Sequence, residues 1–331
     1  MQEICFAIPC YNAAQTLAGV AAEIRAVCAR QGWRYRLILV NDGSCDATWP
    51  LICELAAADP CVHGIDLARN VGQARARMAA LPWLRGHIAV FLDDDGQHPV
   101  EAVDQLVAKV EEGYDLVFAD FSQKQHSGFR RLASRLNGRL LELTGAKPPG
   151  VRLSSFFALS PLAVEQLQHY DSPFPSFTSY IMQCTDRVAD VPLPHRPRAA
   201  GRSGYTFGKL FSQWLTGFTN FSVVPLRLAS ALGALIAAAG FLYGLVLVVR
   251  KLCLPHIVAG YTSIMAVLLL VGGLLMLMLG LVGEYLGRLY MTASRQPVYV
   301  VRREAGAPQG AAEENAAVQN GRQSEAPEGD V

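Results

Sequence analysis

Short apolar runs alternate with longer stretches of helical periodicity over the first 120 residues. The apolar runs predict buried strands at residues 4–9, 37–40, 62–67, 88–92 and 116–119. The intervening stretches predict helices at residues 14–30, 48–58, 72–84 and 99–112. Regular alternation of this kind is typical of an α/β fold, in which helices cover both faces of a mostly parallel sheet.

The pattern changes in the second half of the chain. Residues 128–143 predict a basic amphipathic helix that carries Arg130 and Arg131. Residues 150–204 are rich in proline and serine with few periodic runs, which predicts connecting loops. Residues 205–221 place aromatic and leucine side chains at helical spacing, which predicts a helix lying along a membrane surface.

Two charge-free stretches follow, residues 228–249 and 261–282, each of 22 residues. A helix of this length extends about 33 Å, enough to cross a hydrocarbon core of roughly 30 Å. Arginines flank the outer ends of the pair, while Arg250 and Lys251 lie between the spans. This bias favours both termini on the cytoplasmic side. The tail after Glu304 lacks core-forming residues, which predicts disorder.

Charge and cysteine content exclude several classes of protein. The 331 residues contain 29 Lys and Arg against 28 Asp and Glu, so there is no basic field for nucleic acid. The eight cysteines form no CxxC pair, and we expect reduced, buried thiols rather than a disulfide or zinc framework. The N-terminus lacks a basic segment followed by a long apolar run, so no signal peptide is expected.

Polar residues cluster where four predicted strands end, the edge at which such sheets bind ligands. The segments are PCYN (9–12), VNDGSCDAT (40–48), ARNVG (68–72) and DDDGQHP (93–99). Asp42 follows its strand in a Gly-Ser turn, from which a carboxylate can accept hydrogen bonds from a uracil or ribose. The alternative for Asp42 is a purely structural turn or capping residue.

Three acidic residues directly follow the fourth predicted strand. In an extended segment Asp93 and Asp95 point to one side and Asp94 to the other. Two carboxylates on one side suit a Mg²⁺ or Mn²⁺ ion that bridges the diphosphate of a nucleotide-sugar, and Gln97 extends the ligand set. The alternative is an acidic loop without a ligand.

The motifs PxYN, VNDGSxDxT, RNxG and DxDxQHP, followed by two C-terminal spans, resemble the family 2 glycosyltransferases that act on polyprenyl phosphates. Segments such as SGYTFGKL and LVGEYLGRLY are similar to the membrane end of the aminoarabinose-type transferases within that family. The resemblance runs from the N-terminus to about Arg303. It implies a GT-A fold and inverting transfer of one sugar from a nucleotide-sugar to a lipid phosphate.

The resemblance also assigns roles to residues. It implies a nucleotide pocket formed by Pro9, Tyr11, Asn12, Asp42 and Asp94. It implies that Mg²⁺ or Mn²⁺ binds the catalytic carboxylates together with one amide: Asp93, Asp95 and Gln97. It places catalytic arginines that would bind the lipid phosphate or diphosphate at Arg130, Arg131 and Arg198. A guanidinium suits that task because its fork of donors matches phosphate oxygens.

Five positions depart from the usual family pattern. Ala13 replaces a glutamate, Phe121 an arginine, Arg152 an aspartate, Phe157 an arginine and Gly204 a lysine. Because of these differences, the sequence does not specify the donor sugar or the residues that contact the phosphate. Basic residues near enough in sequence to compensate are Lys124, Arg152 and Arg202.

These inferences give one predicted organisation. A cytoplasmic GT-A catalytic domain spans residues 1–204, an interfacial helix 205–222, a two-helix transmembrane region 223–303, and a disordered tail 304–331. The expected location is the bacterial inner membrane, with the catalytic domain and C-terminus in the cytoplasm. The expected partners are a nucleotide-sugar, with UDP favoured, an undecaprenyl-type phosphate and the lipid bilayer. The family resemblance leaves room for a homo-oligomer.

Two other functions stay open on the sequence alone. A processive polysaccharide synthase would share the nucleotide site, although its QxxRW signature is missing: Gln213 is followed directly by Trp214. A non-catalytic membrane scaffold is favoured by the five departures and opposed by the retained carboxylates. The sequence does not specify the sugar, the nucleotide or the polyprenol.

Overall fold

The computed structural model describes residues 3–121, 151–170, 172, 175–194, 261–293 and 297–306, with isolated positions between 233 and 249. These residues fall into two compact units. The α/β unit lies within Met1–Gly204 and Pro297–Val331, and the helical unit within Tyr205–Gln296. The helices predicted at 128–143 and 205–221 lie outside the described residues.

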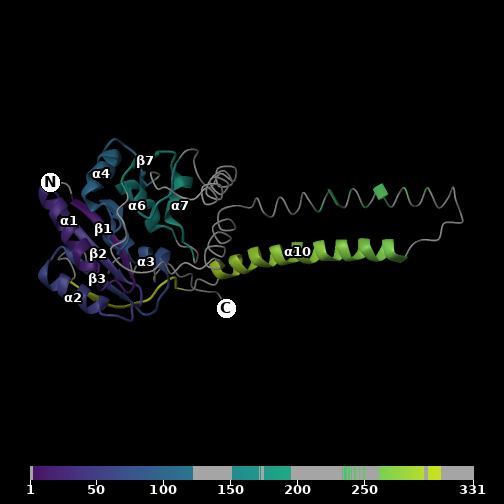
Figure 1. The fold of residues 1–331 in the computed structure, drawn as a ribbon, viewed down its shortest axis with the longest axis horizontal. Helices are drawn as coiled ribbons and strands as arrows, with labels where there is room; N and C mark the ends of the chain where they lie inside the picture. Colours follow the sequence, from purple (N-terminus) through teal and green to yellow (C-terminus); the bar gives the residue numbers. More distant parts are fainter. Residues whose placement is uncertain are drawn as a thin grey trace, which may run out of the picture. The chain divides into compact units, whose positions relative to one another are not determined.

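The α/β unit is built on one eight-stranded sheet (Figure 1). The strands are β1 (Glu3–Cys10), β2 (Arg34–Asn41), β3 (Val62–Leu67), β4 (Ile88–Phe91), β5 (Leu116–Asp120), β6 (Phe157–Leu159), β7 (Val188–Pro192) and β8 (Val301–Ala305). Their spatial order is β7-β5-β6-β4-β1-β2-β3-β8. Only β6 and β8 run antiparallel to their neighbours among the described strands, so the predicted mostly parallel sheet is confirmed.

Helices cover both faces of this sheet. One face carries α1 (Leu17–Gln31), α2 (Thr48–Ala58) and α4 (Val103–Glu111). The other carries α3 (Gln73–Ala80), α6 (Pro161–Gln168) and α7 (Phe177–Cys184). Alternate side chains of each strand therefore enter two separate apolar cores, which is why both faces of the strands are buried.

The first five predicted strands all form, but the helices differ in detail. The helix predicted at 72–84 becomes α3 followed by a 3₁₀ turn, Leu81–Leu84, where Pro82 lies in the first turn. The helix predicted at 99–112 begins as a 3₁₀ turn, Val100–Ala102, before α4. Proline lacks the N–H and restricts the local backbone, so it favours such irregular starts.

The prediction of connecting loops over 150–204 is wrong for the described part of that segment. It contains β6, β7, α6 and α7. Strand β6 has only three residues, too few to show a period, although all three are buried. Helix α6 did carry a start signal, because Ser160 Oγ accepts a hydrogen bond from the Ala163 N–H and Pro161 occupies the first turn.

Strand β8 was not predicted, and the proposed boundary at residue 303 falls inside it. It pairs antiparallel with β3 and forms one edge of the sheet. Arg303 Nε donates to Asp66 Oδ2 at 2.8 Å, and its guanidinium lies 4.9 Å from the centroid of the Trp49 ring. Gly306 lies so close to Ala56 and the Val62 carbonyl that an added Cβ would meet them below 3.0 Å. The tail from residue 307 lies outside the described residues.

A buried histidine joins β3 to β8. His63 is fully buried and stacks on Trp83, with ring centroids 3.9 Å apart. Its Nδ1 donates to the Gly306 carbonyl at 3.1 Å, and its Nε2 lies 3.6 Å from a carboxylate oxygen of Glu304. Burial lowers the pKa of His63, the nearby charge of Arg36 adds to this, and the Gly306 hydrogen bond opposes it.

We expect the β3 and β8 pairing to weaken as the pH falls through about 6.5, the value for an unperturbed histidine. The folded state binds a proton at His63 less readily than the unfolded chain, so this part of the stability is present above that pH and lost below it. Amide hydrogen-exchange protection of the two strands would show the loss. His63→Gln should flatten the pH dependence. His169→Gln, at an exposed position, should leave it unchanged; equal slopes in both variants would contradict the assignment.

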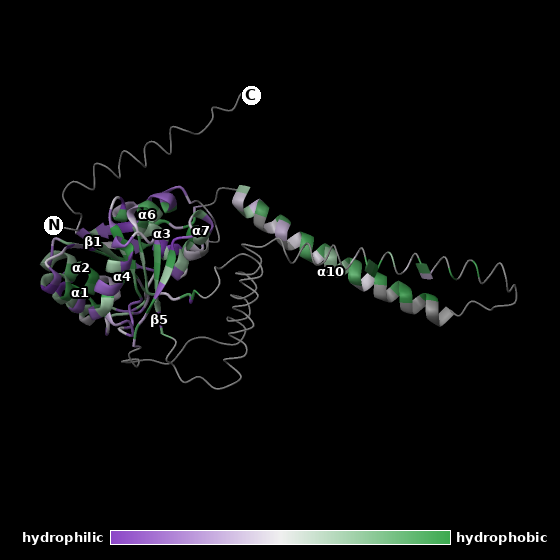
Figure 2. Cartoon of the chain, turned by 90° about the horizontal axis from the view of Figure 1, so that it is seen from above, coloured by the Kyte–Doolittle hydropathy of each residue, from purple (hydrophilic) through white to green (hydrophobic). Residues whose placement is uncertain are grey.

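The helical unit contains α10 (Tyr261–Ala293), which is apolar along most of its length (Figure 2). Large apolar side chains lie exposed on it, such as Leu275, Met276 and Leu279. Among the described residues one stretch, Val271–Ala293, is long and apolar enough to cross a membrane. The second predicted span, 261–282, lies within α10, whereas the first, 228–249, is described only at isolated positions and stays a prediction.

Candidate functional site

The structure brings all four polar strand-end segments together, as the sequence predicts. The N–H of Tyr11 donates to Asp94 Oδ2 at 2.9 Å, and the N–H of Asn12 donates to Ser44 Oγ at 3.0 Å. The third segment joins through Asn70, whose Nδ2 donates to the backbone carbonyl of Asp42 at 2.9 Å. Side chain and backbone thus link the ends of β1, β2, β3 and β4 at one edge of the sheet.

Asp42 is held firmly at the end of β2. Its side chain is buried, and its two oxygens accept the N–H groups of Val71 at 2.7 Å and Gly72 at 2.9 Å. Burial raises the pKa of Asp42, while the two backbone hydrogen bonds act in the opposite direction. Asp42 therefore has the structural role that was the alternative prediction, because it fixes the loop before α3. Its contact with a nucleotide stays a prediction.

The turn after Asp42 has a geometry that few residues can adopt. Gly43 has φ 64°, and a Cβ there would come within 2.5 Å of the Asn70 backbone nitrogen. Asn12, on the facing loop, also has a positive φ of 54° and accepts the Cys45 N–H at 2.9 Å through Oδ1. Asparagine tolerates this conformation better than most residues. The two loops are therefore held against each other by backbone shape as well as by hydrogen bonds.

The acidic segment is a turn, so the prediction that it is extended is wrong. Strand β4 ends at Phe91, Asp94 and Asp95 lie in the turn, and Gly96 has φ 69°. The Gln97 N–H donates to Asp95 Oδ1 at 3.1 Å, an arrangement typical of an aspartate-stabilised turn. Alternation along a strand therefore cannot be used to place the three carboxylates, which we call the acidic turn (Asp93–Asp95).

Asp93 is surrounded by groups that the sequence did not single out. Its Oδ1 accepts hydrogen bonds from the Gln73 amide and from Arg77 Nη2, the latter at 3.3 Å. Its Oδ2 accepts from Ser155 Oγ at 2.6 Å and lies 3.7 Å from His98 Nε2. His98 belongs to the DxDxQHP motif, but the sequence alone predicts no role for it. The other three residues, Gln73, Arg77 and Ser155, lie far from the acidic turn in sequence, and no local sequence pattern identifies them.

Asp94 faces the β1 loop through its bond to Tyr11. Burial raises its pKa to about 6; the Tyr11 N–H lowers it, and the neighbouring carboxylates of Asp93 and Asp95 raise it. Tyr11 itself is 51% exposed, so its ring is free to cover a ligand on that loop. The pair fits the predicted nucleotide-binding role of both residues and does not test it.

The acidic turn has the donor chemistry for a hard divalent cation. Three carboxylates in one turn repel each other, and a bound cation relieves that repulsion. Asp95 and Gln97 lie in the same short turn, as a shared ion requires. Among the described residues, however, the three carboxylates do not form a group in which all the ligand oxygens lie within 4.8 Å of one another. The predicted ligands Asp93, Asp95 and Gln97 therefore fit in chemistry, and their closure around an ion stays a prediction.

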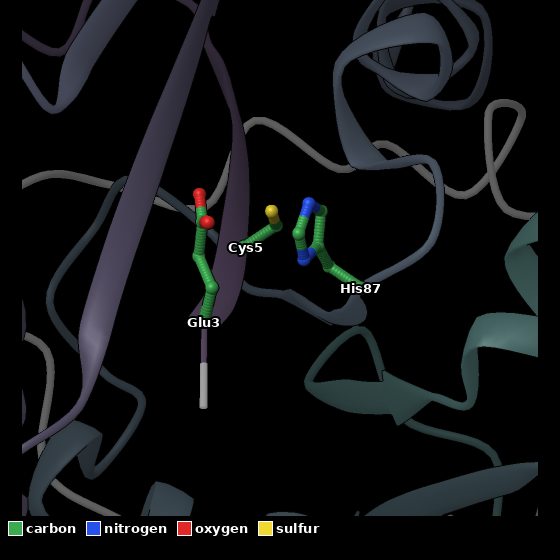
Figure 3. A group of neighbouring side chains, drawn as sticks. All are labelled: Glu3, Cys5 and His87. Carbon is green, nitrogen blue, oxygen red and sulfur yellow. The ribbon is translucent and has the colours of Figure 1, made fainter. Parts of the chain in front are cut away.

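A second group of metal-ligating side chains lies at the opposite ends of the strands. The ligand atoms of Glu3, Cys5 and His87 lie within 4.8 Å of one another (Figure 3). Glu3 already forms an ion pair with Arg36 at 3.1 Å. Burial raises the pKa of Cys5 to about 12, so its thiol stays protonated at neutral pH and is a poor metal ligand. This group does not resemble a metal centre.

The family departures have structural partners where they are described. The Ala13 N–H donates to Thr48 Oγ1 at 2.8 Å. Phe121 stacks on His98, with ring centroids 5.9 Å apart. Arg152 is 60% exposed in its side chain and lies 3.8 Å from an Asp120 oxygen. Phe157 is fully buried in β6. The remaining departure, Gly204, lies outside the described residues.

The arginines assigned to the acceptor fall outside the part of the chain that the structure describes. These are Arg130, Arg131 and Arg198, together with the compensating candidates Lys124 and Arg202. Their roles stay predictions. The described site is therefore the nucleotide and acidic-turn half of the predicted active site.

Comparisons with known proteins identify the family of this chain. Residues 5–160 match the family model Glycosyl transferase family 2, and residues 224–289 match the model GtrB C-terminal hairpin. The undecaprenyl-phosphate 4-deoxy-4-formamido-L-arabinose transferase of Klebsiella pneumoniae is 32% identical over 317 residues, which cover 95% of this chain and 97% of that protein. The uncharacterized glycosyltransferase YkcC of Bacillus subtilis is 29% identical, over 90% of this chain and 93% of its own.

A solved structure shows the same fold. Glucosyl-3-phosphoglycerate synthase from Mycobacterium tuberculosis, crystallised with phosphoglyceric acid, matches 66% of this chain and 80% of its own with a TM-score of 0.50 and 21% identity. The α/β unit is thus a GT-A-like domain of a glycosyltransferase. The chain belongs to the family 2 glycosyltransferases of the polyprenyl-phosphate type.

Proposed function

We propose that this enzyme transfers a single sugar from a nucleotide-sugar, with UDP as the favoured carrier, to an undecaprenyl-type phosphate. The observation that carries the proposal is the convergence of Asp42, Tyr11 and the acidic turn at one edge of the sheet. Relatives whose names specify an undecaprenyl-phosphate acceptor match nearly the whole chain, the membrane hairpin included.

The donor half of the reaction uses the described residues. Asp42 lies at the end of β2, where its remaining acceptor capacity can contact the base or ribose, and Tyr11 lies exposed beside it on the β1 loop. Asp93, Asp95 and Gln97 would hold Mg²⁺ or Mn²⁺, and the bound ion would supply positive charge for the leaving diphosphate. Asp94 fixes the Tyr11 loop against the acidic turn.

The acceptor half needs little acid–base chemistry. A phosphate monoester carries about −1.5 to −2 charge at pH 7, so its oxygen can attack the anomeric carbon without a strong base. A new bond forms between that oxygen and the anomeric carbon while the bond to the diphosphate breaks, with inversion. Arg130, Arg131 and Arg198 would hold the lipid phosphate by charge-assisted hydrogen bonds. Catalysis is then chiefly positioning and charge stabilisation.

The membrane part would bring the lipid to this site. We propose two spans, at 228–249 and 261–282, with the α/β unit and the C-terminus on the cytoplasmic side of the bacterial inner membrane. The match of residues 224–289 to a hairpin model and the outer arginines support this topology. The interfacial segment 205–222 would keep the acceptor arginines at headgroup level.

A direct assay tests the function. Purified full-length protein is incubated with a panel of nucleotide-sugars, a short polyprenyl phosphate and Mn²⁺, and the lipid products are measured by mass spectrometry. We expect one nucleotide-sugar to give a product heavier by one sugar residue. The same polyprenol without phosphate is the control acceptor and should give none. Products carrying several sugars would indicate a processive synthase, and no product from any donor would contradict the proposal.

A further inference from the structure

We propose that Arg77 on α3 is a positioning residue of the donor site, and that it supplies from the helix the positive charge that the family resemblance implies at position 157 on β6. The inference rests on the proposed function for its catalytic meaning. It rests on the contacts of Arg77, Asp93 and Phe157 for its structural basis.

Arg77 reaches from α3 to the acidic turn. Its Nη2 lies 3.3 Å from Asp93 Oδ1 and also donates to the Ser155 carbonyl at 3.4 Å. The side chain is only 13% exposed. An arginine buried to this degree loses much of its hydration, which is costly unless a partner offsets the loss. The contact with Asp93 supplies that partner.

The guanidinium of Arg77 lies over the ring of Phe157, 5.5 Å from its centroid. Position 157 is the place at which this chain has phenylalanine where the family pattern often has arginine. The Arg77 cation therefore lies against the side chain at this position. A planar guanidinium packs well on an aromatic face, so the Phe157 ring also stabilises the position of the Arg77 side chain.

The contacts around the end of β4 place position 157 near the same carboxylate. Phe157 of β6 pairs with Phe91 of β4, and their rings stack with centroids 5.0 Å apart. Just beyond these paired residues, Ser155 Oγ donates to Asp93 Oδ2 at 2.6 Å. Position 157 thus lies two residues from Ser155 and against Arg77, both of which contact Asp93.

The positive charge of Arg77 offsets repulsion within the acidic turn. Asp93 begins a turn of three carboxylates, and repulsion between them would displace any one that lacked a fixed partner. Gln73, Ser155 and Arg77 hold its two oxygens from different elements, and of these only Arg77 carries charge. Arg77 therefore fixes the orientation of Asp93, which in turn sets the start of the acidic turn.

An exchange of the two residues tests the inference. Arg77→Met should lower kcat about 10- to 100-fold, as expected when a reacting group is displaced slightly, with the KM for the lipid acceptor nearly unchanged. The double variant Arg77→Met with Phe157→Arg should recover most of the lost rate, because the new arginine can reach Asp93. Arg77→Lys should recover only part, since it lacks the fork. Arg85→Met, at an exposed arginine outside the site, is the matched control and should match the wild type.

A double variant no better than Arg77→Met would overturn the exchange of roles, and wild-type kinetics in Arg77→Met would overturn the positioning role. A thermal-unfolding cycle with Arg77→Met, Asp93→Asn and both together needs no transfer activity. We expect a midpoint shift for the pair smaller than the sum of the single shifts, whereas additive shifts would contradict the contact. If the wild type transfers no sugar, the proposed function fails while this cycle still decides whether Arg77 holds Asp93.

Discussion

Replacing Asp95 by alanine should reduce sugar transfer by roughly 100-fold or more, the scale expected when a group that stabilises transition-state charge is removed. Asp95 is partly exposed in the acidic turn, where it accepts a hydrogen bond from the Gln97 N–H two residues away. The change should therefore leave the fold intact. Initial rates with saturating donor and acceptor measure the effect, and thermal unfolding checks the fold.

The matched control is Asp186→Ala, which removes an exposed carboxylate far from the acidic turn in sequence. It should have wild-type activity. Chelation by EDTA should abolish transfer by the wild type, and added Mn²⁺ or Mg²⁺ should restore it. Activity that survives both EDTA and the Asp95→Ala change would rule out the metal assignment for this turn.

Arg303→Ala should destabilise the α/β unit by about 1–3 kcal/mol, because it leaves a buried charged acceptor without one of its partners. The side chain of Asp66 is only 4% exposed, and its other oxygen accepts a 2.6 Å hydrogen bond from Asn41 Nδ2. Asn41 immediately precedes Asp42, so the destabilisation should extend from the edge strand β8 toward the donor site. Chemical unfolding followed by the signal of Trp49, which Arg303 covers, measures it.

The neighbouring arginine gives a close comparison. Arg302 is also exposed, but its guanidinium donates to a backbone carbonyl, that of Ala68, at 2.7 Å. Removing it leaves no buried carboxylate unpaired, so Arg302→Ala should cost less than half as much. Equal destabilisation by the two changes would mean that general attachment of β8, and not the Arg303 and Asp66 ion pair, carries the stability.

The parts of the fold that sequence could predict are those with a strong local period. Strands β1 to β5 each contain an apolar run, and the helices between them have one apolar face, so their order gives the mostly parallel sheet. Strands β6 and β8 could not be predicted from the sequence, because their pairing depends on partners that are distant along the chain. β6 is three buried residues between β4 and β5, and β8 contains charged residues whose partners lie on β3.

The site residues likewise fall into those that the sequence could predict and those that it could not. Asp42, Tyr11 and the acidic turn could be found because each follows a predicted strand in a parallel sheet, where strand ends meet. Their detailed geometry could not, since the acidic segment turns after Phe91 and does not stay extended. Arg77 and Ser155 could not be found at all, because only the folded chain brings α3 and the start of β6 against Asp93.

Strand β8 also constrains how many times the chain crosses the bilayer. The α/β unit contains the chain up to residue 204 and again from residue 297, with Val301 paired to β3. Any membrane topology of the intervening segment would therefore have both of its ends on one side. A segment that departs from and re-enters one compartment must cross an even number of times. The proposed topology with two spans meets this condition, whereas a single crossing by α10 would not.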